Sequence, residues 1–156
     1  MNIAIGCDDA GEPLLQIVES LLKEYSDINV SNLSVAPPES VEYYPDVAER
    51  VALAVASDEC DRGILVCGTG IGMAITACKV PGIRAALCHD TYSAERSRKS
   101  NNAQILTMGA RVIGPELAKS IVETWLESEF DGSSPSAPKV RRMEEIDAKY
   151  QNKSKA

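Results

Sequence analysis

Residues 63–72, which read GILVCGTGIG, decide the fold of this chain. The first five are apolar or small on both faces, as in a strand buried at the centre of a parallel sheet. The glycines at positions 68, 70 and 72 indicate a tight turn, and the residues from 71 to about 79 are predicted to form a helix. A buried strand that runs through a glycine-rich turn into a helix is the building unit of an open parallel sheet.

The same alternation of apolar runs and amphipathic stretches continues on both sides of this segment. Further strands are predicted at residues 2–7, 29–35, 83–88 and 103–108, and further helices at 12–25, 46–57, 91–100 and 115–127. The sequence therefore predicts an α/β fold: a single Rossmann-like domain over residues 1–131, with a five-stranded parallel sheet between two layers of helices. Residues 132–138, GSSPSAP, are expected to form a flexible linker to a short charged helix at 139–149.

The composition excludes several classes of protein. The 156 residues carry a net charge of −7, so a nucleic-acid-binding surface, which needs a basic footprint, is not expected. No apolar run approaches the roughly 20 residues that cross a membrane. The five cysteines are odd in number and scattered, and no secretion signal precedes them, so we expect reduced thiols in the cytoplasm. With no CxxC pair and one histidine, a zinc site is not predicted.

Cys67 is the residue of the central segment with the clearest chemical potential. It ends the predicted strand beside the backbone N–H groups of the glycine turn, and both those groups and a helix N-terminus favour an anion. As a thiolate, a cysteine in this position can remove a proton and return it. The alternative is that Cys67 is a small hydrophobic residue of the core and that the turn is purely structural. The spacing of the glycines does not decide between the two.

Other polar residues stand where predicted strands end, at the edge where parallel α/β sheets bind ligands. Asp8 and Asp9 follow the first strand. They could bind hydroxyl groups or transfer protons, or Asp8 could cap the next helix. His89 follows the fourth strand, where a lone histidine is more often a capping or surface residue than a proton shuttle.

Basic and phenolic residues could complete a site for an anion. Arg111, Lys139, Arg141 and Arg142 are of interest because arginine holds phosphate by paired hydrogen bonds, although their spacing does not bring them to the glycine turn. Tyr44 lies in a predicted turn, where it could face a ligand or simply pack.

Seven motifs follow one another along the chain. They are GCDDAG at 6–11, YPD at 44–46, GILVCGTGIG at 63–72, GIRA at 82–85, YSA at 92–94, SNNA at 100–103 and GARVIG at 109–114. Together they resemble the type B ribose-5-phosphate isomerases and the related galactose-6-phosphate isomerases, from residue 3 to about residue 146. Many ordered matches over one domain are far more specific than any single motif.

The resemblance implies an aldose–ketose isomerase that acts on a small phosphorylated sugar, without a metal or other cofactor. Cys67 would be the base that moves a proton between C1 and C2 of the sugar. Thr69 would assist where the sugar ring opens, and Asp8 would bind a hydroxyl or help to open the ring. The backbone of the turn would hold the oxyanion of the enediolate, at Gly68, Gly70, Ile71 and Gly72.

For substrate binding, the resemblance implies that Tyr44 lines the pocket and that Arg111 and Arg142 hold the phosphate. Asn101 would reach the reacting oxygens from the neighbouring subunit, because the family is dimeric or tetrameric with its pockets at the dimer interface. Lys139 stands close to the place of a further family arginine. Residues 132–156 are therefore expected to contribute basic side chains to phosphate binding.

The chain departs from the family pattern at two histidines. Asp9 stands where the family motif usually has histidine, and Ser100 stands where the family has its ring-opening histidine. Loss of general acid–base help costs about 10² to 10⁴ in rate, and Ser100 hardly ionises near neutral pH. Asp9 would also repel a phosphate. We therefore expect enediolate chemistry on a changed substrate: a short sugar phosphate that needs no ring opening, or a differently substituted or unphosphorylated sugar.

Two alternatives to an isomerase stay open at this point. The missing histidines also fit a non-catalytic paralogue that binds sugar phosphates. A thiol redox enzyme is less well supported, because no resolving cysteine is suitably spaced near Cys67.

Overall fold

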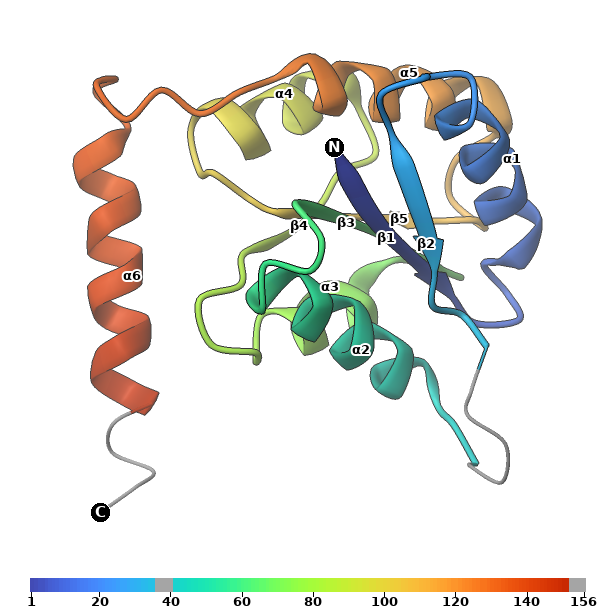
Figure 1. The fold of residues 1–156 in the computed structure, drawn as a ribbon, viewed down its shortest axis with the longest axis horizontal. Helices are drawn as coiled ribbons and strands as arrows, with labels where there is room; N and C mark the ends of the chain where they lie inside the picture. Colours follow the sequence, from blue (N-terminus) through green and yellow to red (C-terminus); the bar gives the residue numbers. More distant parts are fainter. Residues whose placement is uncertain (36–40, 152–156) are drawn as a thin grey trace.

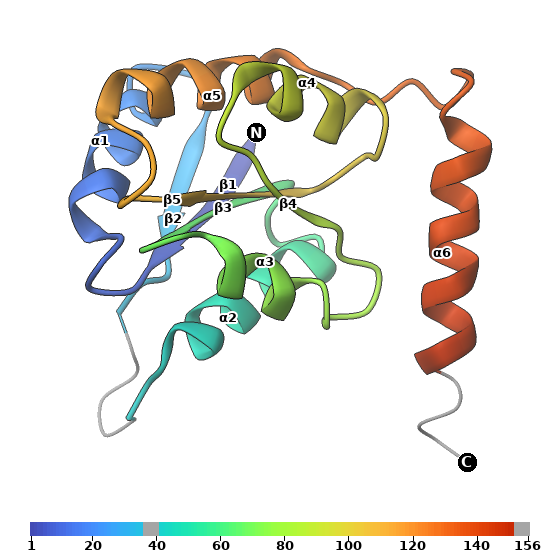
Figure 2. The same ribbon diagram turned by 180° about the vertical axis from the view of Figure 1, so that it is seen from behind.

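A five-stranded parallel sheet forms the middle layer of the structure (Figures 1 and 2). The computed structural model describes residues 1–35 and 41–151. The strands are β1 (Asn2–Cys7), β2 (Asn29–Asn32), β3 (Arg62–Cys67), β4 (Ala85–Leu87) and β5 (Ile105–Gly109). Their order in the sheet is β2-β1-β3-β5-β4, so the segment with which the sequence analysis began lies at the centre. The predicted fold class is confirmed.

Helices cover both faces of the sheet. They are α1 (Glu12–Leu22), α4 (Thr91–Lys99) and α5 (Pro115–Glu127) on one face, and α2 (Tyr44–Ala56) and α3 (Ile71–Ala77) on the other (Figure 1). Each face has its own buried cluster of apolar side chains. Cys7 belongs to the cluster under α1, α4 and α5, whereas Cys67 belongs to the cluster under α2 and α3. The sheet therefore separates these two thiols.

The last helix, α6 (Ala137–Gln151), stands beside the sandwich, at the β4 edge of the sheet (Figures 1 and 2). Two polar contacts join it to the segment before β4. The Gly82 N–H donates to Asp147 Oδ2 at 2.8 Å, and Arg84 lies 3.3 Å from the Glu144 carboxylate. These two contacts tie α6 to the segment before β4, and its residues Ala137 and Val140 are buried.

Some element ends differ from the predicted ones. Helix α2 begins at Tyr44 rather than at residue 46, because Pro45 is well suited to the first turn and the Tyr43 N–H donates to the Asp46 carboxylate at 2.7 Å. Strand β4 is shorter than predicted, since the Ile83 N–H donates to the Val80 carbonyl and closes a turn there.

Two buried arginines satisfy the carbonyl groups at the C-terminal end of α5, which lack partners within the helix. The Arg62 guanidinium donates to the Trp125 carbonyl at 3.0 Å, and Arg98 Nε donates to the Ser128 carbonyl at 3.4 Å. Both arginines also reach the Glu129 carboxylate. Burial, followed by the charge of Arg62, lowers the pKa of Arg98 to about 10. This cluster ties the start of β3 to the ends of α4 and α5.

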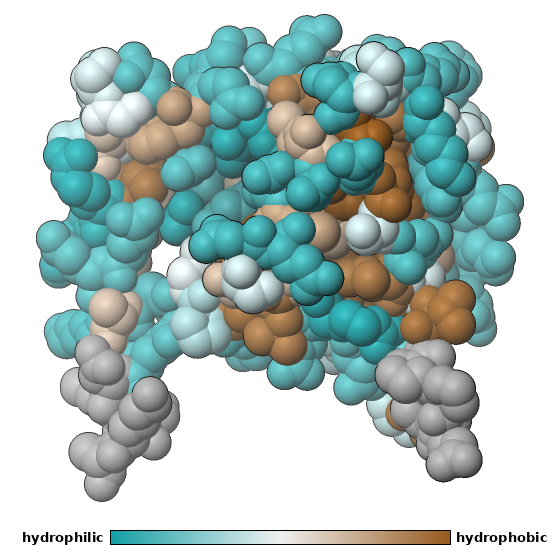
Figure 3. All heavy atoms as spheres, in the orientation of Figure 1, coloured by the Kyte–Doolittle hydropathy of each residue, from teal (hydrophilic) through white to brown (hydrophobic). Residues whose placement is uncertain are grey.

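Hydrophilic side chains cover most of the face shown in Figure 3, with hydrophobic side chains visible between them. Within the described residues, none of the helices combines the length and the apolar character that a membrane crossing needs.

Candidate active site

Cys67 ends β3 and points at the glycine turn that follows. The Gly70 N–H donates to Cys67 Sγ at 3.0 Å. Gly70 has a φ of +77°, a left-handed conformation that glycine adopts without strain, and this conformation folds the turn back over the sulfur. The buried Thr107 hydroxyl on β5 donates to the Gly70 carbonyl at 2.9 Å and fixes the turn from the other side. The residue Cys67 is only 6% exposed.

The end of β5 brings Arg111 to this turn. The Ala110 N–H donates to the Cys67 carbonyl at 2.8 Å, and the Arg111 N–H donates to the Gly68 carbonyl at 3.0 Å. The guanidinium then lies over Gly68, since a Cβ atom built on that glycine would be 3.4 Å from Arg111 Nη1. A positively charged side chain therefore stands directly beside the turn.

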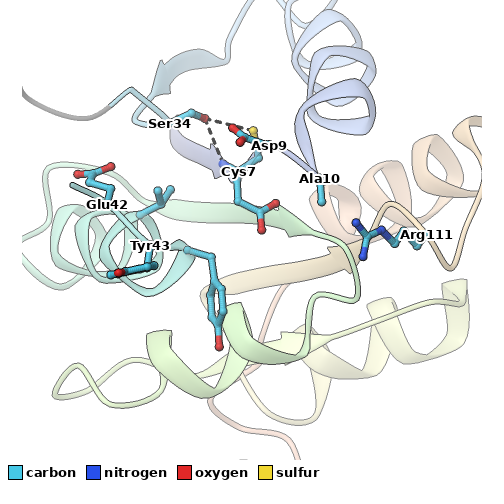
Figure 4. Close-up of a pocket in the computed structure, with 10 residues that line it drawn as sticks. Cys7, Asp9, Ala10, Ser34, Glu42, Tyr43 and Arg111 are labelled. Atoms are coloured by element: carbon cyan, nitrogen blue, oxygen red, sulfur yellow. Dashed lines mark hydrogen bonds between the residues drawn. The ribbon is translucent and has the colours of Figure 1, made fainter. Parts of the chain in front are cut away.

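A cavity of about 640 Å³ opens beyond the carboxyl ends of β1, β2 and β5 (Figure 4). Four predicted site residues line it: Asp8, Asp9, Tyr44 and Arg111. Its other polar or reactive lining residues are Cys7, Ser34, Glu42 and Tyr43, and no sequence pattern pointed to Ser34 or Glu42. In Figure 4, Arg111 lies on the opposite side of the cavity from Glu42 and Tyr43. A phosphate at Arg111 would thus be remote from Glu42.

The carboxylates of the cavity differ in their partners. Glu42 forms a paired contact with Arg50, which lowers the pKa of Glu42 chiefly through the hydrogen bond. Asp8 Oδ1 accepts the Gly11 N–H at 3.0 Å in the turn before α1, but the N-cap of the helix is Gly11, so Asp8 does not cap α1. Asp9 is exposed in the cavity. Asp9 is thus the carboxylate with the greatest freedom to meet a ligand.

Cys7 is the thiol that lines the cavity, next to Ser34. The Cys7 N–H donates to Ser34 Oγ at 3.1 Å, and Ser34 Oγ lies 3.6 Å from Cys7 Sγ (Figure 4). Burial raises the pKa of the Cys7 thiol, and the charges of Glu12, Asp8 and Asp9 raise it further, against an opposing hydrogen bond from Ser34. Cys7 is therefore a poor source of thiolate. Its place directly before Asp8 in the GCDDAG motif was the available sequence signal.

Tyr44 connects the cavity with the glycine turn. A Cβ atom on Gly72 would come within 2.5 Å of Tyr44 Cζ, so the ring lies against the backbone of Gly72 and needs a glycine there. The turn residues Cys67, Gly68, Thr69, Gly70, Ile71 and Gly72 stand next to Tyr44 and Arg111 but do not themselves line the cavity.

Four predicted residues lie elsewhere in this single chain. Ser100 ends α4, and Asn101 follows it, with its side-chain amide donating to the Arg96 carbonyl at 3.2 Å. Asn101 lines a second hollow of about 450 Å³. Lys139 and Arg142 are exposed on α6, where Arg142 pairs with Glu145 at 2.8 Å.

Within the described residues, no group of three or more histidine, cysteine, aspartate or glutamate side chains is arranged to hold a metal ion.

Comparison of the chain with known proteins identifies its family. The family model described as Ribose/Galactose Isomerase matches residues 3–146. The chain is 57% identical to the protein named Ribose-5-P isomerase B of Listeria innocua, over 96% of this chain and 99% of that one. It is 52% identical to D-erythrulose-4-phosphate isomerase of Pectobacterium atrosepticum, over 92% and 93% of the two chains.

The fold agrees with these relatives. The solved structure of ribose-5-phosphate isomerase B from Clostridium thermocellum matches with a TM-score of 0.87 and 47% sequence identity, over 96% of this chain and 99% of that chain. The resemblance drawn from the seven motifs is therefore confirmed, and with it the class of aldose–ketose isomerases of sugar phosphates. The chain belongs to the Ribose/Galactose Isomerase family.

Proposed function

We propose that this chain interconverts the aldose and ketose forms of a four-carbon sugar phosphate, with Cys67 as the base. The observation that carries the proposal is that no imidazole lines the ligand cavity. The one histidine of the chain, His89, accepts a hydrogen bond from Gly109 and is not among the described lining residues. A relative that is 52% identical is named for erythrulose 4-phosphate, which supports the same substrate class.

The chemistry of the substrate explains why an imidazole is not needed. Five- and six-carbon aldose phosphates close rings through O4 or O5, and an acid–base group must open the ring before isomerisation. In a tetrose 4-phosphate the phosphate occupies O4, so a five-membered ring cannot form. The sugar stays open-chain, so the replacement of a ring-opening histidine by Ser100 does not lower the rate of its isomerisation.

The isomerisation then needs one base and one place for negative charge. The Cys67 thiolate removes the proton from C2 of the aldose, and the electron pair of that C–H bond forms the C1=C2 bond of an enediolate. The carbonyl oxygen takes the negative charge, which the N–H groups from Gly68 to Gly72 stabilise. Thr69 and Asp8 hold the two oxygens while a proton moves from O2 to O1. The thiol then returns its proton to C1, which gives the ketose.

Charge sets the direction in which the substrate binds. Arg111 is the guanidinium of the cavity and holds the phosphate by paired hydrogen bonds. Asp9 repels phosphate and accepts hydrogen bonds from sugar hydroxyls, while Tyr44 closes the pocket over Gly72. The phosphate therefore lies at Arg111 and the hydroxyl groups face the carboxylates.

Ser100, Asn101, Lys139 and Arg142 complete the site from a second copy of the chain. Large apolar side chains are exposed around the second hollow and on the elements beside it, which supports a homo-oligomer: Ile75 is 58% exposed, Tyr92 73%, Leu87 38% and Met143 38%. A two-fold interface presents the same patch on both copies, so each copy would receive basic residues from the α6 of its partner.

The mechanism requires a reduced Cys67. All five cysteines are free thiols, which fits the cytoplasmic location that we propose.

A substrate screen tests the proposal. Isomerisation of erythrose 4-phosphate, ribose 5-phosphate and unphosphorylated erythrose is compared, together with solvent deuterium uptake at the carbon next to the carbonyl. We expect kcat/KM for the tetrose phosphate to exceed that for ribose 5-phosphate by about 10²-fold, the scale of a missing acid–base group.

Two cysteine variants localise the base. Cys67→Ala should lower turnover by about 10³-fold, whereas Cys60→Ala should keep it, because Cys60 is also buried but precedes β3 at its opposite end. Faster turnover of ribose 5-phosphate would refute the substrate class, and deuterium uptake by the Cys67→Ala enzyme would refute the base. Ligand-induced stabilisation without turnover on any sugar would show a binding protein instead.

A further inference from the structure

His89 is hydrogen-bonded to the end of β5, the strand that contacts the glycine turn. It follows β4, and its Nε2 accepts the Gly109 N–H at 2.9 Å, at the end of β5. A ring nitrogen that accepts a backbone N–H carries no proton, so the imidazole is neutral and its proton is on Nδ1. The contact therefore exists for one protonation state of His89 only.

Gly109 is in turn the partner of the catalytic segment. It pairs with Cys67 in the sheet, and a Cβ atom on it would lie 2.7 Å from the backbone of Thr69. The next residue, Ala110, donates its N–H to the Cys67 carbonyl at 2.8 Å. Any movement of Gly109 is thus passed directly to the thiol and to the turn that faces it.

The charges around this contact are few. Burial lowers the pKa of His89, and the neighbouring Asp90 opposes the shift. Asp90 itself is engaged at the start of α4, where its two oxygens accept the N–H and the hydroxyl of Ser93, each at 2.7 Å. Across the contact, the ionisable groups next to Gly109 are Cys67, its partner in the sheet, and Arg111.

We propose that neutral His89 is a positioning residue for Cys67, acting through the hydrogen bond from Gly109. Protonation of His89 places its Nε2–H opposite the Gly109 N–H, so that two donors face each other and the hydrogen bond breaks. The end of β5 is then released, and the Cys67 thiol shifts relative to the glycine turn. The consequence is a loss of kcat as His89 gains its proton. The kinetic part of this inference rests on the proposed function of Cys67.

A spectroscopic test does not depend on turnover. Since His89 is the one histidine of the chain, its imidazole signals in ¹H–¹⁵N correlation spectra of the whole protein need no assignment by mutagenesis. We expect the Nδ1–H form at pH 8, and a backbone N–H signal of Gly109 that shifts with the same midpoint as the imidazole. An Nε2–H form, or a Gly109 signal that ignores the titration, would overturn the proposal whatever the substrate is.

Kinetics of three variants add the functional arm. His89→Ala should lower kcat by about 10-fold at pH 8, the scale of one lost hydrogen bond. His89→Gln, whose side-chain oxygen can accept the same N–H but does not titrate, should recover most of that loss. Cys88→Ala, a buried neighbour on the same segment, is the matched control and should lower stability while leaving kcat and its pH dependence as in the parent chain.

The pH dependence of kcat distinguishes protonation of His89 from protonation of the substrate phosphate, which also titrates at about pH 6. The parent chain should lose kcat as His89 gains its proton, and the His89→Gln variant should keep only the part due to the phosphate. Identical profiles in the two enzymes, or equal losses in His89→Gln and His89→Ala, would refute the positioning role. If Cys67 is not the base, the spectroscopic result and the rate of Cys67 alkylation still decide whether His89 holds the turn.

Discussion

The glycine at position 70 permits a direct measurement of how tightly the turn after β3 is packed. Gly70→Ala places a methyl group at a φ of +77°, which costs about 1–2 kcal/mol for an L-residue. The same methyl would lie 2.7 Å from Leu87 Cδ1 and 2.8 Å from the Met108 carbonyl carbon. Because the Met108 backbone cannot move aside, overpacking adds about 1–3 kcal/mol. We expect a total loss of about 3 kcal/mol.

Two other glycines separate strain from crowding. Gly82 has a φ of +78° with nothing within 4 Å of an added Cβ, so Gly82→Ala should lose only the 1–2 kcal/mol, roughly, of the left-handed backbone. Gly132 has neither feature, and Gly132→Ala should change stability by less than about 0.5 kcal/mol. Guanidinium unfolding at one protomer concentration, followed by the fluorescence of the single, fully buried Trp125, measures all three. A Gly70→Ala loss no greater than that of Gly82→Ala would refute the close packing of the turn on β5.

Three further outcomes are expected. Thr107→Val, which removes the hydroxyl that holds the buried Gly70 carbonyl, should lower the free energy of unfolding by about 1–3 kcal/mol in the same assay and slow turnover. Arg62→Met, which leaves the Trp125 carbonyl without its buried donor, should cost about 3 kcal/mol, and an unchanged unfolding midpoint would contradict the capping role. Burial lowers the pKa of His89, so as the pH falls the unfolded chain takes up a proton on this imidazole before the folded chain does. The contribution of neutral His89 to the free energy of unfolding is therefore complete above about pH 6.5 and is lost as pH falls below that value. Unfolding midpoints between pH 5 and 8 should show this slope in the parent chain but not in His89→Gln.

The fold was predictable because the signals that carry it are local. The apolar run of β3 followed by three alternating glycines specifies a central strand, a turn and a helix without reference to the rest of the chain. The start of α2 was less predictable, since the bond between the Tyr43 N–H and Asp46 that begins this helix depends on the entry angle of the preceding loop.

The site was only partly predictable from sequence. Asp8, Asp9, Tyr44 and Arg111 meet in one cavity because they follow strands or begin helices at one edge of the sheet. Glu42 comes from the segment before α2, and no periodic pattern places such residues. The position of Asn101 depends on where α4 ends, and that of Arg142 on where α6 lies, and their spacing does not differ from that of ordinary exposed residues.

The sheet that separates Cys7 from Cys67 also determines how Cys67 responds to oxidation. A peroxide converts a thiolate to a sulfenic acid, and a second thiol can rescue it as a disulfide where the two Cβ atoms point toward each other. Cys7 and Cys88 pack on the opposite face, Cys60 precedes the far end of β3, and Cys78 lies beyond the far end of α3. Sulfenylated Cys67 therefore has no internal partner and proceeds to the irreversible sulfinic form unless a small cellular thiol reaches it first.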